Sequence, residues 1–564
     1  MDLHDPTNST SEPTRYWSTT NIGEAMPDVL SPMCWSFWGP NMEAGARLAY
    51  YDFGLLPKSD LGVPENPNEL LVAYFFGRPA MNLDRLRSLF DPIPGMTADD
   101  FERDICGKVR DGLPPIPKSR QTTLNVIAKA PAGMVRAGRQ IKRSAAEQRT
   151  WWEREVHDGA GLSDPRRLLK ESAARFREAF RAHVRARFVL MSFHAQLTKL
   201  AESAGREDLV VRLLAGLGGV TETDVADDLW LVGADRLPLV ARGSGGVPQD
   251  CFIRRHGFHG PLEGNVAGAS WREDPAGVLP MAKAMAARPA DQRPRQREAT
   301  MIAGRQASID ELKAALPRSK QASVGLLCGA AARCVRTTEI GKASFLMALD
   351  GGRAATRAIG RAQRDAGRLD EVDDAFYLTI DELLEPLPDD VMDLVRFRRE
   401  RRDEYRRLEV PATFTGTPQA TVRADDLGGG AGDVLTGVAG SSGVVEGTAR
   451  VVVDPFEAEP LEPGEVLVCR FTDPSWAPLF TLADALVIDI GAAASHGAIV
   501  ARELGVPCVI GTGDGTRRIR TGDRLLVDGS AGRVEILDRP PGGPGVSPGQ
   551  GRREPHQNAH EDGG

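Results

Sequence analysis

The chain has 564 residues and a formal net charge of −8 at pH 7, with 70 basic and 78 acidic side chains interspersed along it. This length allows several domains and a large buried core, and the mixed charge leaves no electrostatic footprint for nucleic acid or an anionic membrane. We therefore expect no nucleic-acid partner. The 7 cysteines form no CxxC pair and no zinc-spaced cluster with histidine, so we expect reduced thiols and no dedicated metal site.

Residues 1–14 are polar and interrupted by proline, so we expect them to be disordered and order to begin near Trp17. They lack the basic-then-apolar arrangement of a signal peptide. No run of about 18 apolar residues occurs anywhere in the chain. We therefore expect a cytoplasmic protein without a membrane partner.

The stretch 17–39 is crowded with aromatic residues, glycines and prolines. This composition is typical of a fixed loop or a pocket wall, and a packed corner of the core is the alternative. A helix is predicted over 42–51 and a strand over 70–76, with Arg78 at the end of that strand. An arginine in this position is suited to holding a phosphate, although solvated arginines are far commoner.

Most of the following sequence is helix-forming. The basic stretch 118–150 has no interleaved aromatic residues, so a solvated helical face is the better interpretation than nucleic-acid binding. Apolar residues at helical spacing and helix-compatible composition predict further helices over 165–205, 207–217, 299–316, 322–338, 342–369 and 389–408. Together these segments predict an α-rich domain over 15–410.

An irregular loop interrupts these helices at 254–264, where glycines and a proline separate His256, His259 and Glu263. Loops on a rigid scaffold are common places for binding sites. The His, His and Glu spacing does not match a helical zinc motif, so we expect no metal there.

Glycines and scattered polar residues over 411–433 predict a flexible linker. Short apolar runs separated by glycine turns then predict an α/β domain over 434–538. The proline- and glycine-rich segment 539–564 is expected to be a disordered tail. The predicted fold class is therefore multidomain, with an α-rich domain followed by an α/β domain.

Within the α/β domain, the stretch 485–511 predicts a strand, a tight turn, a short helix and a second strand. Ser495 is a good N-cap, Gly505 suits the left-handed position after a helix, and Pro507 prevents the helix from continuing. His496 then lies in the first helical turn, where free N–H groups and the helix dipole favour an anion. A neutral imidazole there can attack phosphorus and pass the phosphoryl group on.

This stretch, Gly491-Ala-Ala-Ala-Ser-His496, resembles the phosphohistidine motif in the swivelling domain of the phosphoenolpyruvate-utilising enzymes, which include phosphoenolpyruvate synthase and rifampicin phosphotransferase. Ser442-Gly-Val-Val-Glu-Gly447, Phe471-Thr-Asp-Pro-Ser-Trp476 and Thr521-Gly-Asp-Arg-Leu-Leu-Val-Asp-Gly529 look like the same domain, in the same order. The resemblance implies that His496 is the phosphate carrier and that Ser495, Gly497 and Arg502 support it. Ala492 is a departure, since the family commonly has a second glycine there.

Earlier segments resemble the acceptor-substrate region of rifampicin phosphotransferase-like and phosphoenolpyruvate synthase-like proteins. An Asn-x-Gly-Glu segment and a Pro-x-x-Trp segment open that region, which makes Asn21, Glu24 and Trp35 pocket candidates, and the segment 77–82 adds Arg78. The loop at 254–274 looks like the family's Gly-x-x-Gly-x-x-Glu element followed by Trp-x-Glu. By that resemblance Glu263 is a candidate to accept the proton of an attacking hydroxyl, and His259, Arg255 or Arg272 is a candidate to offset phosphate charge.

In single-chain relatives an ATP-grasp domain phosphorylates the histidine, but no GxxxxGK[ST] loop or substantial region precedes the segment at Trp17. We therefore expect a phosphotransferase component loaded by a separate ATP-grasp protein, which binds ATP and Mg²⁺, as in phenylphosphate synthase with its separate polypeptides. The acceptor is expected to be a small-molecule hydroxyl, and its phosphate either stays in the product or activates the hydroxyl for later elimination. A non-catalytic binding or regulatory subunit, or an enzyme that uses the α-rich pocket without phosphate, remain the alternatives.

Overall fold

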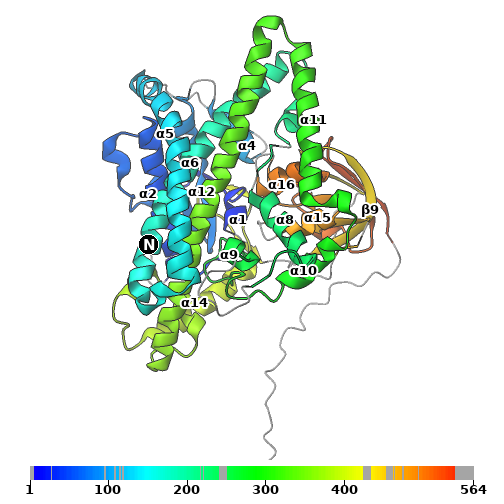
Figure 1. Ribbon diagram of the computed structural model, residues 1–564. Coiled ribbons are helices and arrows are strands. Elements are labelled where there is room, and N and C mark those ends of the chain that lie inside the picture. Colours follow the sequence, from blue (N-terminus) through cyan, green and yellow to red (C-terminus); the bar gives the residue numbers. More distant parts are fainter. Residues whose placement is uncertain are drawn as a thin grey trace, which may run out of the picture.

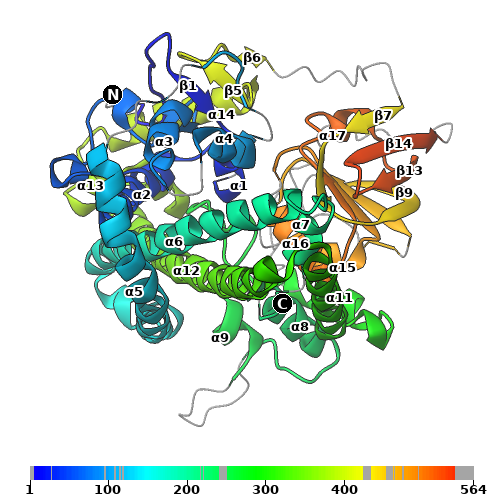
Figure 2. The same ribbon diagram turned by 90° about the horizontal axis from the view of Figure 1, so that it is seen from above.

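The computed structural model describes residues 5–26, 28–93, 97–106, 109–113, 116, 120–215, 217–219, 221–240, 250–422, 433–452, 461–462, 464–472, 476–492 and 495–539. A helix-rich body, residues 5–422, fills one side of the molecule, and an α/β domain, residues 433–539, lies on the other side (Figures 1 and 2). The observed architecture is thus helix-rich and multidomain, with the α/β part at its C-terminal end.

The helices of the described chain are α1 (Ile22–Ala25), α2 (Pro32–Asp52), α3 (Leu83–Phe90), α4 (Ala98–Cys106), α5 (Arg120–Trp152), α6 (Pro165–Glu202), α7 (Leu209–Leu213), α8 (Thr221–Gly233), α9 (Phe252–His256), α10 (Val278–Ala286), α11 (Pro294–Ala315), α12 (Arg318–Asp365), α13 (Ile380–Leu384), α14 (Val391–Arg406), α15 (Ala477–Leu482), α16 (His496–Leu504) and α17 (Gly515–Arg518). The strands are β1 (Tyr16–Ser18), β2 (Val72–Phe75), β3 (Arg78–Asn82), β4 (Leu408–Glu409), β5 (Thr413–Thr415), β6 (Thr421–Val422), β7 (Val434–Thr436), β8 (Val438–Ser441), β9 (Val444–Val452), β10 (Glu465–Cys469), β11 (Ala485–Ile488), β12 (Cys508–Ile510), β13 (Arg524–Asp528) and β14 (Arg533–Asp538).

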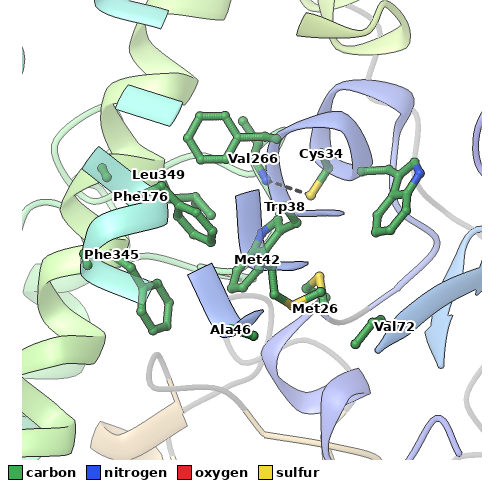
Figure 3. Packing of buried hydrophobic residues seen from close by; sticks show 14 of the residues in the cluster. Met26, Cys34, Trp38, Met42, Ala46, Val72, Phe176, Val266, Phe345 and Leu349 are labelled. Carbon is green, nitrogen blue, oxygen red and sulfur yellow. Dashed lines mark hydrogen bonds between the residues drawn. The ribbon is translucent and has the colours of Figure 1, made fainter. Parts of the chain in front are cut away.

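The core of the body forms where α2, α6 and α12 pack along one another, with α5 alongside (Figure 1). Aromatic and aliphatic side chains from these helices interlock around Trp38, as Figure 3 shows. Trp38 also donates its indole N–H to the carbonyl of Gly264 at 2.8 Å, and Val266 donates its backbone N–H to the Cys34 sulfur at 3.4 Å. The core therefore holds the loop predicted from its irregular composition.

Several predicted elements differ from the observed ones. Of the two interpretations of the stretch 17–39, the packed corner of the core agrees with the structure, since Phe37 and Trp38 are buried in the core. The second half of this stretch is not a loop: α2 begins at Pro32, and Ser31 caps it by accepting the Cys34 N–H at 3.3 Å. The two helices predicted over 322–338 and 342–369 are one helix, α12. Gly341 interrupts their pattern without breaking the helix, since it lies where α12 approaches α6, and a Cβ there would lie 3.0 Å from the Cα of His183.

Two segments predicted to be disordered or flexible make specific contacts with the body. Within 1–14, Thr7 accepts the Gly77 N–H at 2.9 Å, and buried Asp5 accepts the Tyr405 hydroxyl; residues 1–4 lie outside the described chain. Within 411–433, β5 pairs with β1 in a four-stranded sheet, and residues 423–432 lie outside the described chain. The predictions of disorder over 5–14 and of flexibility at 413–415 are therefore wrong. The tail beyond residue 539 is also outside the described chain.

Eight strands form the sheet of the α/β domain, in the order β7-β14-β13-β9-β10-β11-β12-β8. The central strands β9 to β12 run parallel, and β8 and β13 run antiparallel to their neighbours. Every residue of β10 and β11 is buried, as parallel strands covered on both faces require. The α/β composition predicted beyond the linker is confirmed.

The two parts share an apolar cluster. Buried side chains of α8 and α10 in the body, including Leu229 and Met285, belong to the same cluster as Phe480 of α15 and Val500 of α16. Helices α8 and α11 lie against the α/β domain in both views (Figures 1 and 2). Among the described residues, no helix combines the length and apolar character needed to cross a membrane.

Candidate functional site

The turn around residue 496 has the predicted local structure. Strand β11 ends at Ile488, Ser495 occupies the N-cap with extended backbone angles, and α16 begins at His496. The helix ends at Gly505, whose φ of 66° is the left-handed conformation that glycine adopts without strain. The side chain of His496 lies outside the described part of the structure, whereas its backbone position in the first turn confirms the predicted placement.

Two buried hydroxyl groups lie at the N-terminus of α16. The Ser495 and Thr472 side-chain oxygens have no hydrogen-bond partner among the described residues, and both residues are 1% exposed. A Cβ on Gly497 would lie 2.7 Å from the Thr472 hydroxyl, so glycine is needed for this close approach. Thr472 was not predicted as a site residue, although its position just after a parallel strand was a usable signal, because ligands bind at the carboxyl ends of such strands.

Helix α1 of the body reaches this turn. Glu24 is 6% exposed, and its carboxylate oxygen lies 2.6 Å from the position that a Cβ on Gly491 would occupy. Just before α1, Asn21 has φ 68° and ψ −52°, and Ile22 donates its N–H to the Thr20 carbonyl at 2.8 Å. This is a classic γ-turn, which is rare and strained. The structure thus places Glu24 beside the turn that precedes His496, and Asn21 in the γ-turn that leads into α1.

The predicted pair His259 and Glu263 is joined by a hydrogen bond. The Nδ1 of His259 lies 2.7 Å from the Glu263 carboxylate, and both side chains are at most 5% exposed. Glu263 also lies 3.9 Å from the Lys342 ammonium group. A carboxylate oxygen accepts, so this hydrogen bond places a proton on Nδ1, and the ring nitrogen that does not contact Glu263 is Nε2. That Nε2 is buried without a hydrogen-bond partner in the described chain.

The same loop contacts α1. A Cβ on Gly264 would overlap the carbonyl oxygen of Ala25 and lie 2.9 Å from its carbonyl carbon. Helix α1 therefore lies between two glycines, Gly264 in the body and Gly491 in the α/β domain. Through these contacts the His259 and Glu263 pair is connected to the turn that carries His496.

The predicted phosphate-binding residue Arg272 is instead engaged in a buried ionic network. Its guanidinium donates to the Asp350 carboxylate at 2.9 and 3.1 Å, and Trp152 donates to the same carboxylate at 2.8 Å. Burial favours the neutral acid, but the paired guanidiniums of Arg272 and Arg353 and the hydrogen bonds outweigh it and lower the pKa of Asp350 to about 2. This network fixes the loop from its far side.

Arg353 completes that fixation by donating to the carbonyls of Glu263 and Asn265 at 3.3 and 3.1 Å. The backbone of the loop is thereby fixed on both sides of the Glu263 side chain. Arg272 and Arg353 consequently position the loop, and the substrate contact predicted for Arg272 remains a prediction.

Arg255 lies at a separate, highly charged cavity of about 530 Å³. It forms ion pairs with Asp228 at 2.9 Å and with Asp250, and Asp228 also lies 2.8 Å from Nε2 of His256. Burial lowers the pKa of His256 to about 4 in spite of that carboxylate. The rings of His256 and His259 are 6.3 Å apart, so the cavity adjoins the His259 and Glu263 pair.

The other predicted residues, Trp35, Arg78 and Arg502, make structural contacts outside the charged cavity. Trp35 packs against Tyr74 with ring centroids 3.7 Å apart. Arg78 donates to the Tyr405 and Leu408 carbonyls at 3.0 and 2.8 Å, where α14 ends. In the α/β domain, Arg502 donates to the Gly440 carbonyl at 2.7 Å and so joins α16 to β8; burial lowers its pKa to about 10.

The described side chains do not fit a magnesium-nucleotide site. In that part of the chain, no three His, Cys, Asp or Glu side chains are grouped to hold a metal ion. Mg²⁺ bound to a nucleotide takes carboxylate ligands, and nucleotide phosphates take a glycine-rich loop.

Comparison with known proteins identifies two segments. Residues 461–532 match the family model of the PEP-utilising enzyme mobile domain, and residues 182–339 match that of the rifampicin phosphotransferase fourth domain. The first segment contains β10 to β13 and α16, and the second runs from within α6 to within α12. The resemblance predicted from the motifs is confirmed for both parts of the chain.

The chain is similar to several curated proteins over part of their length. It is 44% identical over 177 residues to a rifampicin phosphotransferase of Streptomyces sviceus, which is 30% of this chain and 20% of that protein. It is 36% identical over 178 residues to a rifampicin phosphotransferase of Bacillus subtilis, which is 31% of this chain and 20% of that protein.

An uncharacterised protein of Mycobacterium tuberculosis is 34% identical over 283 residues, which is 50% of this chain and 30% of that protein. The chain thus spans between 20% and 30% of the length of these relatives. It contains a segment that matches the mobile domain of PEP-utilising enzymes and a segment that matches the fourth domain of rifampicin phosphotransferase.

Proposed function

We propose that this chain is a phosphotransferase component in which His496 carries a phosphoryl group to a hydroxyl of a small molecule bound by the helix-rich body. The observation that supports it best is the contact of Glu24 and α1 with the turn before His496. The body of the molecule thereby supplies buried polar groups on the side where the carrier helix begins.

The N-terminus of α16 has the features that a phosphoryl group on His496 needs. The backbone N–H groups of the first helical turn and the dipole favour negative charge. The hydroxyls of Ser495 and Thr472 are buried beside them and have no partner in the described chain. These donors would neutralise charge on the phosphoryl oxygens, and positioning and charge neutralisation are most of what phosphoryl transfer requires.

In the transfer step, the acceptor hydroxyl oxygen bonds to phosphorus as the nitrogen–phosphorus bond of phosphohistidine breaks. The electron pair of that bond returns to the His496 ring, and the hydroxyl proton goes to Nε2 of His259. Glu263 then stabilises the imidazolium through its bond to Nδ1. In this assignment His259 is the base and Glu263 orients it. The base predicted from the sequence was Glu263 instead.

Loading of His496 is assigned to a separate ATP-grasp protein, which binds ATP and Mg²⁺. The proposal includes this partner and a swivelling of the α/β domain between a loading and a transfer position. It specifies the acceptor only as a hydroxyl of a small molecule. The fold alone does not name an acceptor.

The test is mass spectrometry of the intact protein and its phosphopeptides at neutral to alkaline pH, after incubation with Mg-ATP and a candidate ATP-grasp partner. We expect acid-labile phosphate on the peptide containing His496, no label in His496→Ala, and normal label in the control variant His194→Ala from α6. Absence of label with a partner that phosphorylates another mobile domain would refute the carrier assignment. It would favour a binding subunit or an enzyme that needs no nucleotide.

A further inference from the structure

The loop that precedes α8 forms an anion-binding nest, which is a concavity lined by successive backbone N–H groups. Gly218 and Gly219 both have left-handed backbone angles, with φ of 68° and 69°. The N–H groups of Leu217, Gly218 and Gly219 all donate to carboxylates. We call residues 217–219 the 217–219 nest.

One of the carboxylates in this nest comes from the α/β domain. Glu503 lies on α16, about two turns after His496, and is 1% exposed. Both of its carboxylate oxygens lie 3.1 Å from the Leu217 nitrogen, and it also accepts the Gly218 N–H. The helix that begins with His496 is therefore attached to the body by a buried, hydrogen-bonded carboxylate.

The rest of the nest is fixed by the body itself. Glu298 of α11 accepts the Gly219 N–H at 2.7 Å. Arg336 of α12 donates to the carbonyls of Leu217 and Gly218 at 2.9 and 3.1 Å. The nest is thus held in place without Glu503, so its N–H groups are already positioned when the carboxyl group of Glu503 docks.

The contact is enclosed by apolar groups. A Cβ on Gly505, which ends α16, would lie 2.8 Å from the Met301 sulfur of α11. Leu504 belongs to the apolar cluster that the two domains share. Water is therefore largely excluded from the carboxylate while the domains are in contact.

We propose that Glu503 is a positioning residue that holds α16, and with it His496, against the body through the 217–219 nest, and that loss of a proton from Glu503 weakens this contact. The inference rests on the proposed function only in that the α/β domain must leave the body to be loaded. The contact itself is independent of phosphate.

Burial in the contact raises the pKa of Glu503 to about 7, because desolvation outweighs the two N–H hydrogen bonds. The charged groups that face it are Glu298 and Arg305 of α11, of which Glu298 raises this pKa and Arg305 lowers it. Arg502 on its own helix and Arg336 of α12 are the other charged groups beside the contact.

The sign of the pH dependence follows from this raised pKa. Separated domains return the carboxyl to water, where its ordinary pKa is 4.5. The docked state then binds the proton more tightly, so the contact is strongest below pH 4.5 and weakens as pH rises through about 7. The docking equilibrium constant should fall roughly tenfold per pH unit between pH 5 and pH 7 and level off above about pH 7.5.

The test is amide hydrogen exchange of the unphosphorylated full chain from pH 5 to pH 8, corrected for intrinsic exchange rates and resolved to single residues. In the wild type, protection of the Leu217 and Gly218 amides should fall by roughly two orders of magnitude over this range. Glu503→Gln keeps an acceptor oxygen and should show protection that no longer depends on pH. Glu503→Ala should lose most of that protection at every pH.

The Gly219 amide is the internal control, since its partner Glu298 belongs to the body. It should stay protected in both variants, which also shows that the body remains folded. Unchanged protection of Leu217 and Gly218 in Glu503→Ala would overturn the positioning role. A flat wild-type profile, or a Glu503→Gln profile that titrates like the wild type, would overturn the proton linkage. Neither result depends on whether His496 carries phosphate.

Discussion

The contact between α1 and the loop of His259 and Glu263 can be tested by adding a single methyl group. In Gly264→Ala, the new Cβ would overlap the Ala25 carbonyl oxygen and lie 2.9 Å from its carbon, whereas ordinary contact begins at 3.4 Å. The carbonyl carbon must therefore move by at least about 0.5 Å, and the oxygen must move further. Both sides of the clash are backbone, so no side chain can rotate away.

The loop cannot easily yield, because Trp38 and Arg353 hold the carbonyls on and around Gly264. We expect α1 to move instead and to withdraw Glu24 from the turn before His496. Overpacking of this kind costs about 1–3 kcal/mol, and the backbone clash places Gly264→Ala at the upper end, at about 3 kcal/mol of unfolding free energy. Transfer to an acceptor should fall, while loading of His496 should persist.

The assay is urea unfolding followed by tryptophan fluorescence, together with phosphate loading and transfer. The control is Gly23→Ala in α1, where a Cβ meets nothing within 4 Å. Because alanine is favoured over glycine in a helix, this control should be unchanged or stabilised by about 0.4–1 kcal/mol. Equal unfolding midpoints for the two variants would refute the reasoning that α1 is fixed between two glycines.

Two further predictions concern the loop and its supports. Asp350→Ala should lower the free energy of unfolding by about 3–5 kcal/mol, because it leaves the Arg272 and Arg353 guanidiniums buried without their carboxylate; an unchanged urea midpoint would contradict this. The pKa of Asp350 is lowered to about 2, so the contribution of its ionised carboxylate to the free energy of unfolding is present above pH 3.8 and is lost as pH falls toward 2. Asp350→Asn should therefore flatten the acid side of a stability–pH curve measured by urea unfolding. His259→Gln should reduce transfer roughly 10²–10⁴-fold without affecting loading of His496, measured as single-turnover phosphate release to acceptor, and Glu263→Gln should shift the pH profile of transfer. Equal transfer rates in His259→Gln and the wild type would remove His259 from the chemistry.

The arrangement of the loop explains why residues chosen for phosphate binding have other contacts. Arg272 satisfies Asp350, and Arg255 satisfies Asp228 and Asp250. A guanidinium paired with carboxylates belongs to a cluster whose net positive charge is small, so the cluster attracts a phosphate only weakly. In contrast, the hydroxyls of Ser495 and Thr472 and Nε2 of His259 are buried without a hydrogen-bond partner in the described chain.

The local structure around His496 was determined by the sequence itself. The left-handed Gly505 and the following Pro507 are preferences of neighbouring backbone units, so they predict the end of the helix wherever the domain lies. Ser495 occupies the predicted N-cap position, but its hydroxyl does not make the capping hydrogen bond that favours serine there. The long helices of the body were predicted for the same reason, since apolar spacing is a property of contiguous sequence. The break predicted between 338 and 342 was wrong. A glycine weakens a solvated helix, but Gly341 lies inside α12 and permits its close approach to α6.

Only the tertiary structure decided which side chains meet. Glu24 reaches Gly491, Arg272 reaches Asp350, and Glu503 reaches the Leu217 backbone across separate parts of the chain. Such pairings depend on how helices and sheet pack, which no local backbone preference encodes. The sequence therefore identified the helix that begins at His496, whereas packing determined what surrounds it.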